Sequence, residues 1–261
     1  GAFFMATLFM WSISVIFEIL FNNRPELSTI FIGFLFFQSA NLFIRKCSSS
    51  RDPDPLFVNT CVSLLHASIT SAAVVSIVVK EWRRSGVHRM FEHSELVETT
   101  WSCAYEALCI SCGYFAYDQS DMLLNGVYNT PSILLHHLVL LVCFTLALYR
   151  KLTINYLILT LICELHSISL HVRKLRRMSR IRDQNRTAVK VEWMLNFATF
   201  LSARFASHVL ITIKLLRDAT KFQQGGVELP LALTGMAAMN LLNVFLGMDL
   251  LSAYTRETRR R

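Results

Sequence analysis

Two neighbouring apolar runs in the middle of the sequence contain titratable residues. The first, PSILLHHLVLLVCFTLALYR at residues 131–150, includes a histidine pair. The second, TINYLILTLICELHSISLHVRK at residues 153–174, includes an acid and two further histidines. Titratable groups are costly in hydrocarbon, and those found there usually serve a function. The pattern therefore predicts a site formed by His136, His137, Glu164, His166 and His171.

The spacing of these residues on helices separates their roles. His136 and His137 point about 100° apart, so only one can face a given partner. Glu164 and His171 are seven residues apart and share a face, whereas His166 lies to one side. A carboxylate near an imidazole can orient the ring for proton transfer. The alternative is a set of ordinary hydrogen bonds between membrane helices, without any chemistry.

Two aspartates follow the weakly hydrophobic stretch 99–117. Asp118 and Asp121 each stand four residues after a tyrosine, so a helix would place each acid beside an aromatic hydroxyl. They come at the end of the predicted span, on the side that we assign to the cytosol. Solvation at the membrane boundary explains them without a function. A lipid site at the same depth would include them.

His66 and Arg204 also lie within apolar runs. His66 enters its run from the same predicted side, and Arg204 is four residues before a further histidine, His208. A buried arginine needs an acid or a lipid phosphate as partner, and Glu106 and Glu164 are suitable acids. We therefore predict one lipid or acyl pocket lined by His66, Asp118, Asp121, His136, His137, Glu164, His166, His171 and Arg204.

Membrane helices must position these side chains. Of 261 residues, 53% are hydrophobic and only 17% are charged, against roughly a quarter in soluble domains. The apolar runs are long enough to cross about 30 Å of hydrocarbon. We predict an all-α polytopic membrane protein with about eight transmembrane helices, at residues 2–21, 27–45, 56–79, 99–117, 132–149, 153–172, 193–216 and 230–254.

Local breaks divide the chain. The Asp-Pro-Asp-Pro sequence at 52–55 interrupts it between the second and third runs. We predict an N-terminal helical hairpin at 1–54, a main domain at 55–255 and a basic cytosolic tail at 256–261. Residues 81–97 are too polar to cross, and we expect a helix at the interface there. The first run lacks a cleavage site, so we expect an anchor.

Positive charge gathers between the apolar runs. The net charge is +8, and its placement favours lipid contact and membrane orientation over nucleic-acid binding. The excess puts both termini and loop 173–192 in the cytosol. The sequon Asn185-Arg186-Thr187 in this loop should then carry no glycan. Residues predicted to hold anionic headgroups or CoA phosphates are Arg173, Lys174, Arg176, Arg177 and Arg180.

Motifs for metals and cofactors are incomplete. Cys109 and Cys112 form a C-x-x-C without a second pair, and the seven cysteines lie mostly in apolar runs as reduced core residues. One His-His pair and one His-x4-His are too few for a lipid desaturase-like iron site. The sequence also lacks a glycine-rich phosphate loop and a G-x-S-x-G elbow. We expect no metal and no cofactor.

Four segments resemble the TLC domain, which ceramide synthases, translocating-chain-associated membrane proteins and other TLC-domain-containing proteins share. They are SLLHASITSAAVV, SCGYFAYDQSDMLLNG, ILLHHLVLLVCF and LICELHSISLHVRKL. The resemblance covers about residues 55–255. It implies six helices around a cavity open to the cytosol. The combination of GYF-x-x-D, LLHH and a following Glu is most similar to the branch that limits membrane-fluidising lipids.

The match to ceramide synthases is partial. Their His-His pair is matched by His136-His137, but their following HD-x-x-D motif is replaced by Cys163-Glu164-Leu165-His166-Ser167. The resemblance implies a regulator of phospholipid composition and fluidity at the plasma membrane, restraining polyunsaturated chains. The alternatives are an acyl-CoA-dependent acyltransferase, with His136, His137 and Glu164 as catalytic candidates, and a cargo receptor for membrane proteins. The endoplasmic reticulum is the alternative location.

Overall fold

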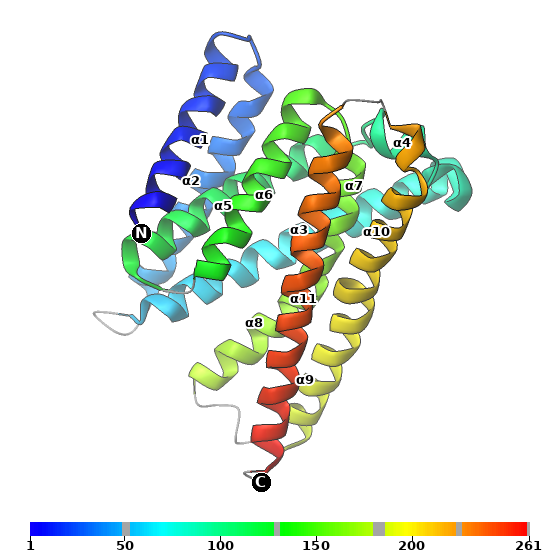
Figure 1. The fold of residues 1–261 in the computed structure, drawn as a ribbon. Helices are drawn as coiled ribbons and strands as arrows, with labels where there is room; N and C mark the ends of the chain where they lie inside the picture. Colours follow the sequence, from blue (N-terminus) through cyan, green and yellow to red (C-terminus); the bar gives the residue numbers. More distant parts are fainter. Residues whose placement is uncertain (49–52, 128–130, 180–185, 223–225, 260–261) are drawn as a thin grey trace. The chain divides into compact units, whose positions relative to one another are not determined.

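The computed structural model describes residues 1–48, 53–127, 131–179, 186–222 and 226–259 (Figure 1). All secondary structure in these residues is helical, which confirms the predicted all-α class. The elements are α1 (Ala2–Leu20), η1 (Pro25–Leu27), α2 (Ser28–Cys47), α3 (Pro55–Met90), α4 (His93–Val97), α5 (Ala104–Asn125), α6 (Pro131–Arg150), α7 (Ile154–Thr160), η2 (Leu161–Cys163), α8 (Glu164–Met178), α9 (Arg186–Thr199), η4 (Phe200–Ala206), α10 (Ser207–Arg217), η5 (Ala219–Lys221) and α11 (Glu228–Arg259).

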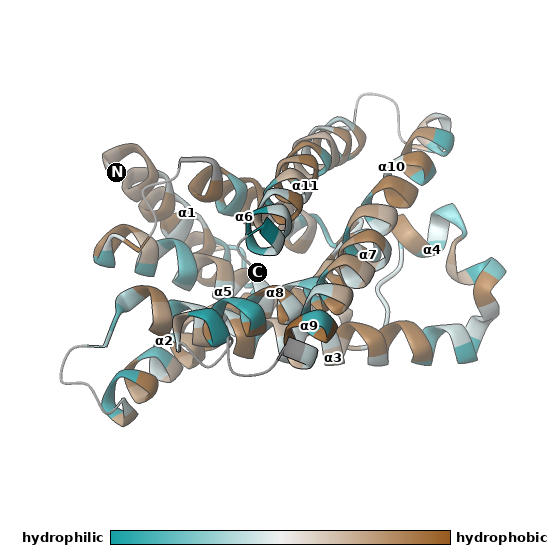
Figure 2. Ribbon diagram, turned by 90° about the horizontal axis from the view of Figure 1, so that it is seen from below, coloured by the Kyte–Doolittle hydropathy of each residue, from teal (hydrophilic) through white to brown (hydrophobic). Residues whose placement is uncertain are grey.

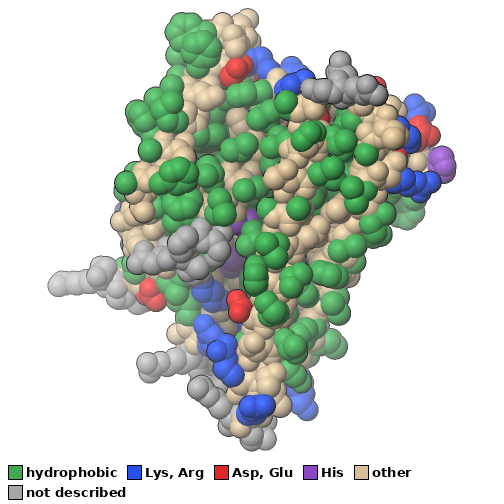
Figure 3. Space-filling view, viewed as in Figure 1, with side chains coloured by type: hydrophobic (Ala, Val, Ile, Leu, Met, Phe, Trp, Pro, Cys, Tyr) green, Lys and Arg blue, Asp and Glu red, His purple; other side chains and the backbone are tan. Residues whose placement is uncertain are grey.

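Seven helical segments in the described residues are long and apolar enough to cross a membrane. Figure 2 shows hydrophobic residues along α1 and α10. Figure 3 shows hydrophobic side chains over most of one face, with Lys and Arg gathered near the C-terminal end of α11. The predicted eighth span, 99–117, corresponds to α5, which is not among the seven. Its polar residues lower its hydropathy, and most of them are buried.

Two compact units make up the chain, residues 1–161 and 162–261. The predicted limit at 54 follows the Asp-Pro-Asp-Pro break and the limit at 255 follows the extent of the resemblance, and both stay predictions. The pocket predicted from residues of both halves also stays a prediction. Each unit contains buried polar residues of its own.

A close helix crossing holds unit 1 together. Gly113 of α5 faces the backbone of α2, where a Cβ atom would lie 2.2 Å from the Ile30 carbonyl oxygen. Gly33 of α2 faces Ile110 in return, at 3.0 Å. Small residues allow membrane helices to approach this closely. The N-terminal hairpin is therefore packed directly on the helix that carries the two aspartates.

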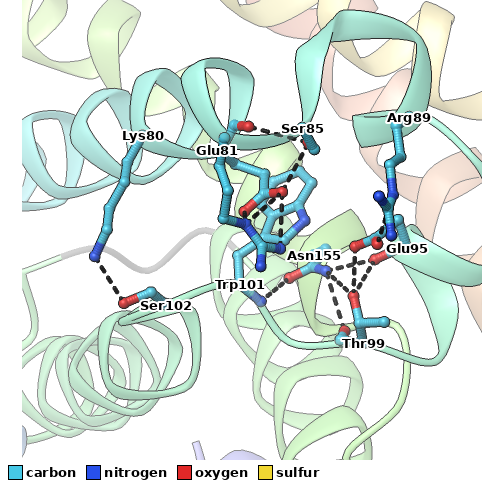
Figure 4. A network of polar contacts seen from close by, with 10 residues as sticks. Lys80, Glu81, Ser85, Arg89, Glu95, Thr99, Trp101, Ser102 and Asn155 are labelled. Atoms are coloured by element: carbon cyan, nitrogen blue, oxygen red, sulfur yellow. Dashed lines mark hydrogen bonds and ion pairs between the residues drawn. The ribbon is translucent and has the colours of Figure 1, made fainter.

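Most of the segment 81–97 is helical, as predicted, and its place at the membrane interface stays a prediction. Helix α3 continues through this segment to Met90, broken at Gly86, whose φ of 76° is outside the helical range. A second short helix, α4, follows it. Figure 4 shows how the next loop is fixed: Asn155 of α7 accepts a hydrogen bond from the Trp101 amide and donates to the carbonyls of Glu95 and Thr99. The α3–α5 connection is thus tied to α7.

Unit 2 contains a continuous helical rod formed by α9, η4 and α10 (Figure 1). Its core includes Trp193 and Phe200 packed against Leu250 of α11. The predicted span 153–172 is one of the seven segments able to cross a membrane, and it runs from Ile154 to Met178 through α7, η2 and α8. Much of the predicted loop 173–192 is therefore helical, because Arg, Lys and Leu favour helix even where they are too polar for a span.

Candidate functional site

Asp118 and Asp121 are buried, which corrects their predicted place at the solvated boundary. Helix α5 runs past both acids to Asn125, and they are 3% and 6% exposed. Gly126 ends the helix with a φ of 60°, the left-handed conformation that commonly follows a helix. The acids therefore lie on the last two turns of a helix and not in the loop after it.

Carboxamide groups from neighbouring helices hold these two carboxylates. The Asn59 amide of α3 donates to Asp118 Oδ1 at 2.7 Å and to Asp121 Oδ2 at 2.9 Å. The Asn41 amide of α2 donates to Asp121 Oδ1 at 3.2 Å and to the Tyr117 hydroxyl at 2.6 Å. Arg45 Nε donates to the Asn41 oxygen at 2.8 Å. Helices α2 and α3 therefore both contact the two carboxylates of α5 through side-chain amides.

His137 of α6 completes the group. Its Nε2 atom lies 3.5 Å from Asp118 Oδ2, and the side chain is 6% exposed. A carboxylate accepts hydrogen bonds, so this contact places the ring proton on Nε2 and leaves a lone pair on Nδ1. His136 is half-buried next to it. An imidazole oriented by a carboxylate in this way can act as a base.

His66 has an aromatic environment instead. Its ring stacks on Tyr114 with the centroids 3.7 Å apart and the planes within 6°. Phe37 of α2 contacts both rings edge-on. Tyr114 therefore packs against a histidine in addition to standing one turn before Asp118. Unit 1 brings His66, Asp118, Asp121 and His137 into one region.

Arg204 organises the polar residues of unit 2. It lies in η4, a π-helical turn, of the kind frequently found at functional sites. Its Nη2 atom donates to the Ser167 hydroxyl at 2.8 Å and to the Cys163 carbonyl at 3.4 Å. Of the two acids named as suitable partners, Glu106 is exposed, and Glu164 interacts electrostatically with Arg204.

Histidines surround this arginine. His208 Nδ1 donates to the Arg204 carbonyl at 2.8 Å. His166 Nδ1 lies 3.2 Å from the Thr199 hydroxyl, whose own hydrogen goes to the Leu195 carbonyl at 2.6 Å. The Arg204 charge acts on both rings and on His171. Unit 2 thus brings Glu164, His166, His171 and Arg204 together.

Sequence reasoning missed the residues that hold the acids. Asn41 and Asn59 each stand alone in an apolar run, where an asparagine is usually interpreted as contact between helices. One signal was available, because Asn59 and His66 are seven residues apart and share the face of α3 that meets α5. Gln119, fully buried beside Asp118, was also missed.

Part of the predicted headgroup-binding set has partners inside unit 2. The Arg173 guanidinium lies 4.3 Å from the centre of the Trp193 ring. Arg176 forms an ion pair with Glu192 at 2.9 Å. Arg177 is exposed and Lys174 is half-buried. Arg180 and Asn185 of the sequon lie outside the described residues.

The structure also shows the cysteines and the other residues of types that bind metals. All seven cysteines are free thiols, and Cys109 and Cys112 are buried in α5. Within the described ranges, no three His, Cys, Asp or Glu side chains are grouped so that they could hold a metal ion. The arrangement of the two polar groups supports binding and proton chemistry by side chains.

A family model of the TLC domain, described as TRAM, LAG1 and CLN8, matches residues 56–252. The chain belongs to the TLC-domain family. This assignment agrees with an integral membrane protein of apolar helices. Helices α1 and α2 precede the matched region.

Its curated relatives include TLC domain-containing proteins 1 and 2. It is 26% identical over 155 residues to protein 2 of Danio rerio, covering 58% of this chain and 61% of the relative. It is 27% identical over 199 residues to protein 2 of Homo sapiens, covering 74% and 69%. It is 27% identical over 146 residues to protein 1 of Rattus norvegicus, covering 55% of this chain and 58% of the relative. The matches thus span about six-tenths of these relatives. No solved structure matches the chain.

Proposed function

We propose that this TLC-domain protein regulates phospholipid composition and membrane fluidity by limiting the incorporation of polyunsaturated acyl chains. The branch that contains TLC domain-containing proteins 1 and 2 implies this role. We further propose that the protein acts at the plasma membrane, with the endoplasmic reticulum as alternative. Its partners are membrane phospholipids or their acyl chains, and basic residues such as Arg177 contact anionic headgroups.

One observation carries the proposal of a regulator over that of an enzyme. Ceramide synthases, which share the His-His pair, have a histidine and a second aspartate where this chain has Cys163 and Ser167. Here the Ser167 hydroxyl and the Cys163 carbonyl both accept hydrogen bonds from Arg204. These positions therefore hold a cation in place and supply no acid–base pair for acyl transfer.

The test is lipid analysis in cells that lack the protein. We expect the polyunsaturated fraction of phospholipids to rise after feeding with polyunsaturated fatty acid, and the membrane order reported by a polarity-sensitive dye to fall. Re-expression of the parent chain should restore both. Unchanged composition in depleted cells would contradict the proposal. Surface labelling of the re-expressed protein distinguishes the two locations.

A second function, acyl transfer from acyl-CoA, is favoured by the Asp118–His137 contact at 3.5 Å. A carboxylate-oriented imidazole is the arrangement that activates a hydroxyl or amine for attack. Purified protein incubated with labelled acyl-CoA tests it. Transfer, or a covalent acyl adduct, that is lost in His137→Ala would support the enzyme. Retention of the label in that variant would exclude His137 as its carrier.

A further inference from the structure

Gln119 of α5 is a buried amide that the proposed function has not used. Its side chain is 0% exposed, and neither its oxygen nor its nitrogen has a hydrogen-bond partner among the described residues. Burial of an amide without hydrogen bonds costs about 1–3 kcal/mol judged by mutational data. A group that bonds to this amide from outside the chain would remove that cost.

The position of Gln119 on α5 places it beside His137. Cys112 and Phe115 share its helix stripe, and both contact α6, through Thr145 at 3.7 Å and through the His137 ring at 5.6 Å between centroids. Gln119 is two turns beyond Cys112, a shift of about 10 Å. Since α5 and α6 run antiparallel, the same shift along α6 leads from Thr145 to the residues around His137.

His137 presents a complementary atom. Its Nε2 faces Asp118, whereas its Nδ1 atom is buried and has no partner among the described residues. Nδ1 is therefore an acceptor, and the Gln119 amide offers N–H donors and one oxygen. The two side chains together can bind a neutral group that contains a carbonyl oxygen and a hydroxyl. A phosphate, which offers mainly acceptors, fits an imidazole lone pair poorly.

We propose that Gln119 and His137 bind the glycerol region of a lipid with an ester carbonyl beside a free hydroxyl. The ester carbonyl accepts from the Gln119 amide, and the hydroxyl donates to His137 Nδ1. Exposed Leu124 and Leu135, near the ends of α5 and α6 that adjoin this pair, provide apolar surface for the acyl chain. The inference rests on the proposed function, since it names the lipid class that the protein binds. Lysophospholipids and diacylglycerols both contain this group.

The test measures binding to the purified full-length chain in detergent micelles, from the shift in its unfolding temperature. The probes are oleoyl-lysophosphatidylcholine, its alkyl ether analogue without the carbonyl, its 2-O-methyl analogue without the hydroxyl, and dioleoylglycerol. We expect each missing group to weaken binding roughly five- to tenfold, the value of one neutral hydrogen bond. Equal binding of the lysolipid and dioleoylglycerol would show that the phosphate is not required. A preference for one of them would show which of the two lipid classes the protein binds.

Two variants separate ligand binding from a structural role. Gln119→Met should abolish the preference for ester over ether and leave the unfolding temperature without lipid unchanged or raised, because no internal hydrogen bond is lost. Gln38→Met, the same change at a half-buried position of α2, should keep the preference. Equal binding of ester and ether by the parent, or a lower unfolding temperature of lipid-free Gln119→Met, would overturn the inference. Either result would leave the cellular test of lipid composition unaffected.

Discussion

The two units hold buried charge in opposite ways. In unit 1, two carboxylates of α5 receive hydrogen bonds from asparagines of α2 and α3, so three helices share one network. In unit 2, a single guanidinium donates to a hydroxyl and a backbone carbonyl around one π-helical turn. The first group joins acids and amides on three helices, and the second joins one cation of η4 to neutral groups of η2 and α8.

This difference predicts different tolerance to substitution. Removal of a donor that two buried acids share leaves each carboxylate without one of its hydrogen bonds, which is costly in a protein interior. Removal of Arg204 leaves a hydroxyl and a carbonyl, both neutral, without their donor, beside the Glu164 carboxyl on which the Arg204 charge also acts. Unit 1 should therefore depend on its polar network for stability, whereas unit 2 should depend on Arg204 chiefly for binding.

Gly113→Ala should have the largest effect, because it breaks the α2–α5 crossing on which the unit 1 network depends. The new Cβ atom would lie 2.2 Å from one backbone atom and 2.7 Å from another, so the helices must separate. We expect loss of monodisperse protein in detergent, measured by size-exclusion chromatography. Gly247→Ala in unit 2 is the control, since its Cβ would meet only the Phe200 ring at 2.9 Å. Normal yield of Gly113→Ala would show that the helices are not in close contact.

Asn59→Leu should come next. It removes the shared donor of Asp118 and Asp121, and we expect a loss of about 3 kcal/mol of unfolding free energy. Asn240→Leu in unit 2 is matched in residue type, but Asn240 makes one neutral hydrogen bond to Thr212, so about 1 kcal/mol is expected. Thermal unfolding of both variants in the same detergent compares them. Equal losses would remove the distinction between the two units.

Part of this arrangement could be predicted from the sequence. Apolar runs locate the helices, because the length of hydrocarbon sets the length of a span. The titratable residues within them locate the two polar regions. The end of α5 was predicted too early because hydropathy falls at Asp118, although the Asn125-Gly126 pair signals the actual end.

The pairing of side chains between helices could not be predicted. Whether Asp118 faces Asn59, His137 or solvent depends on how α3, α5 and α6 rotate against one another, and the glycine contact between α2 and α5 constrains that packing. The hydropathy of a segment does not indicate how its helix is rotated about its own axis. In the same way, the π-helical turn that presents Arg204 has no marker in the sequence FLSARFA.

Arg204→Met should have a smaller effect on stability than Asn59→Leu. The substitution leaves two neutral acceptors without their donor, so we expect a loss of about 1–2 kcal/mol. The lipid phenotype should nevertheless be lost in cells, because the variant retains the fold without the cation. Arg204→Lys should restore it only in part, since a lysine lacks the planar fork of donors. A loss of several kcal/mol in Arg204→Met would mean that unit 2 also depends on its charge for folding.

The smallest effect should come from substitution of Asp218. This residue directly follows α10 and belongs to neither of the two buried polar groups. Burial alone would raise the pKa of Asp218, but hydrogen bonds from Lys214 and Lys221 outweigh it, so the pKa lies below its ordinary value of about 3.8. A group with a lowered pKa stabilises the fold at pH values above its ordinary pKa. This contribution is lost as the pH falls below about 4 and through the lowered pKa. The difference in unfolding temperature between the parent and Asp218→Asn should therefore be present at pH 7 and shrink towards pH 3. Lys221→Met should reduce that difference, because it removes one of the two donors. A difference that stays constant across this range would show that the Asp218 side chain acts through packing and not through its charge.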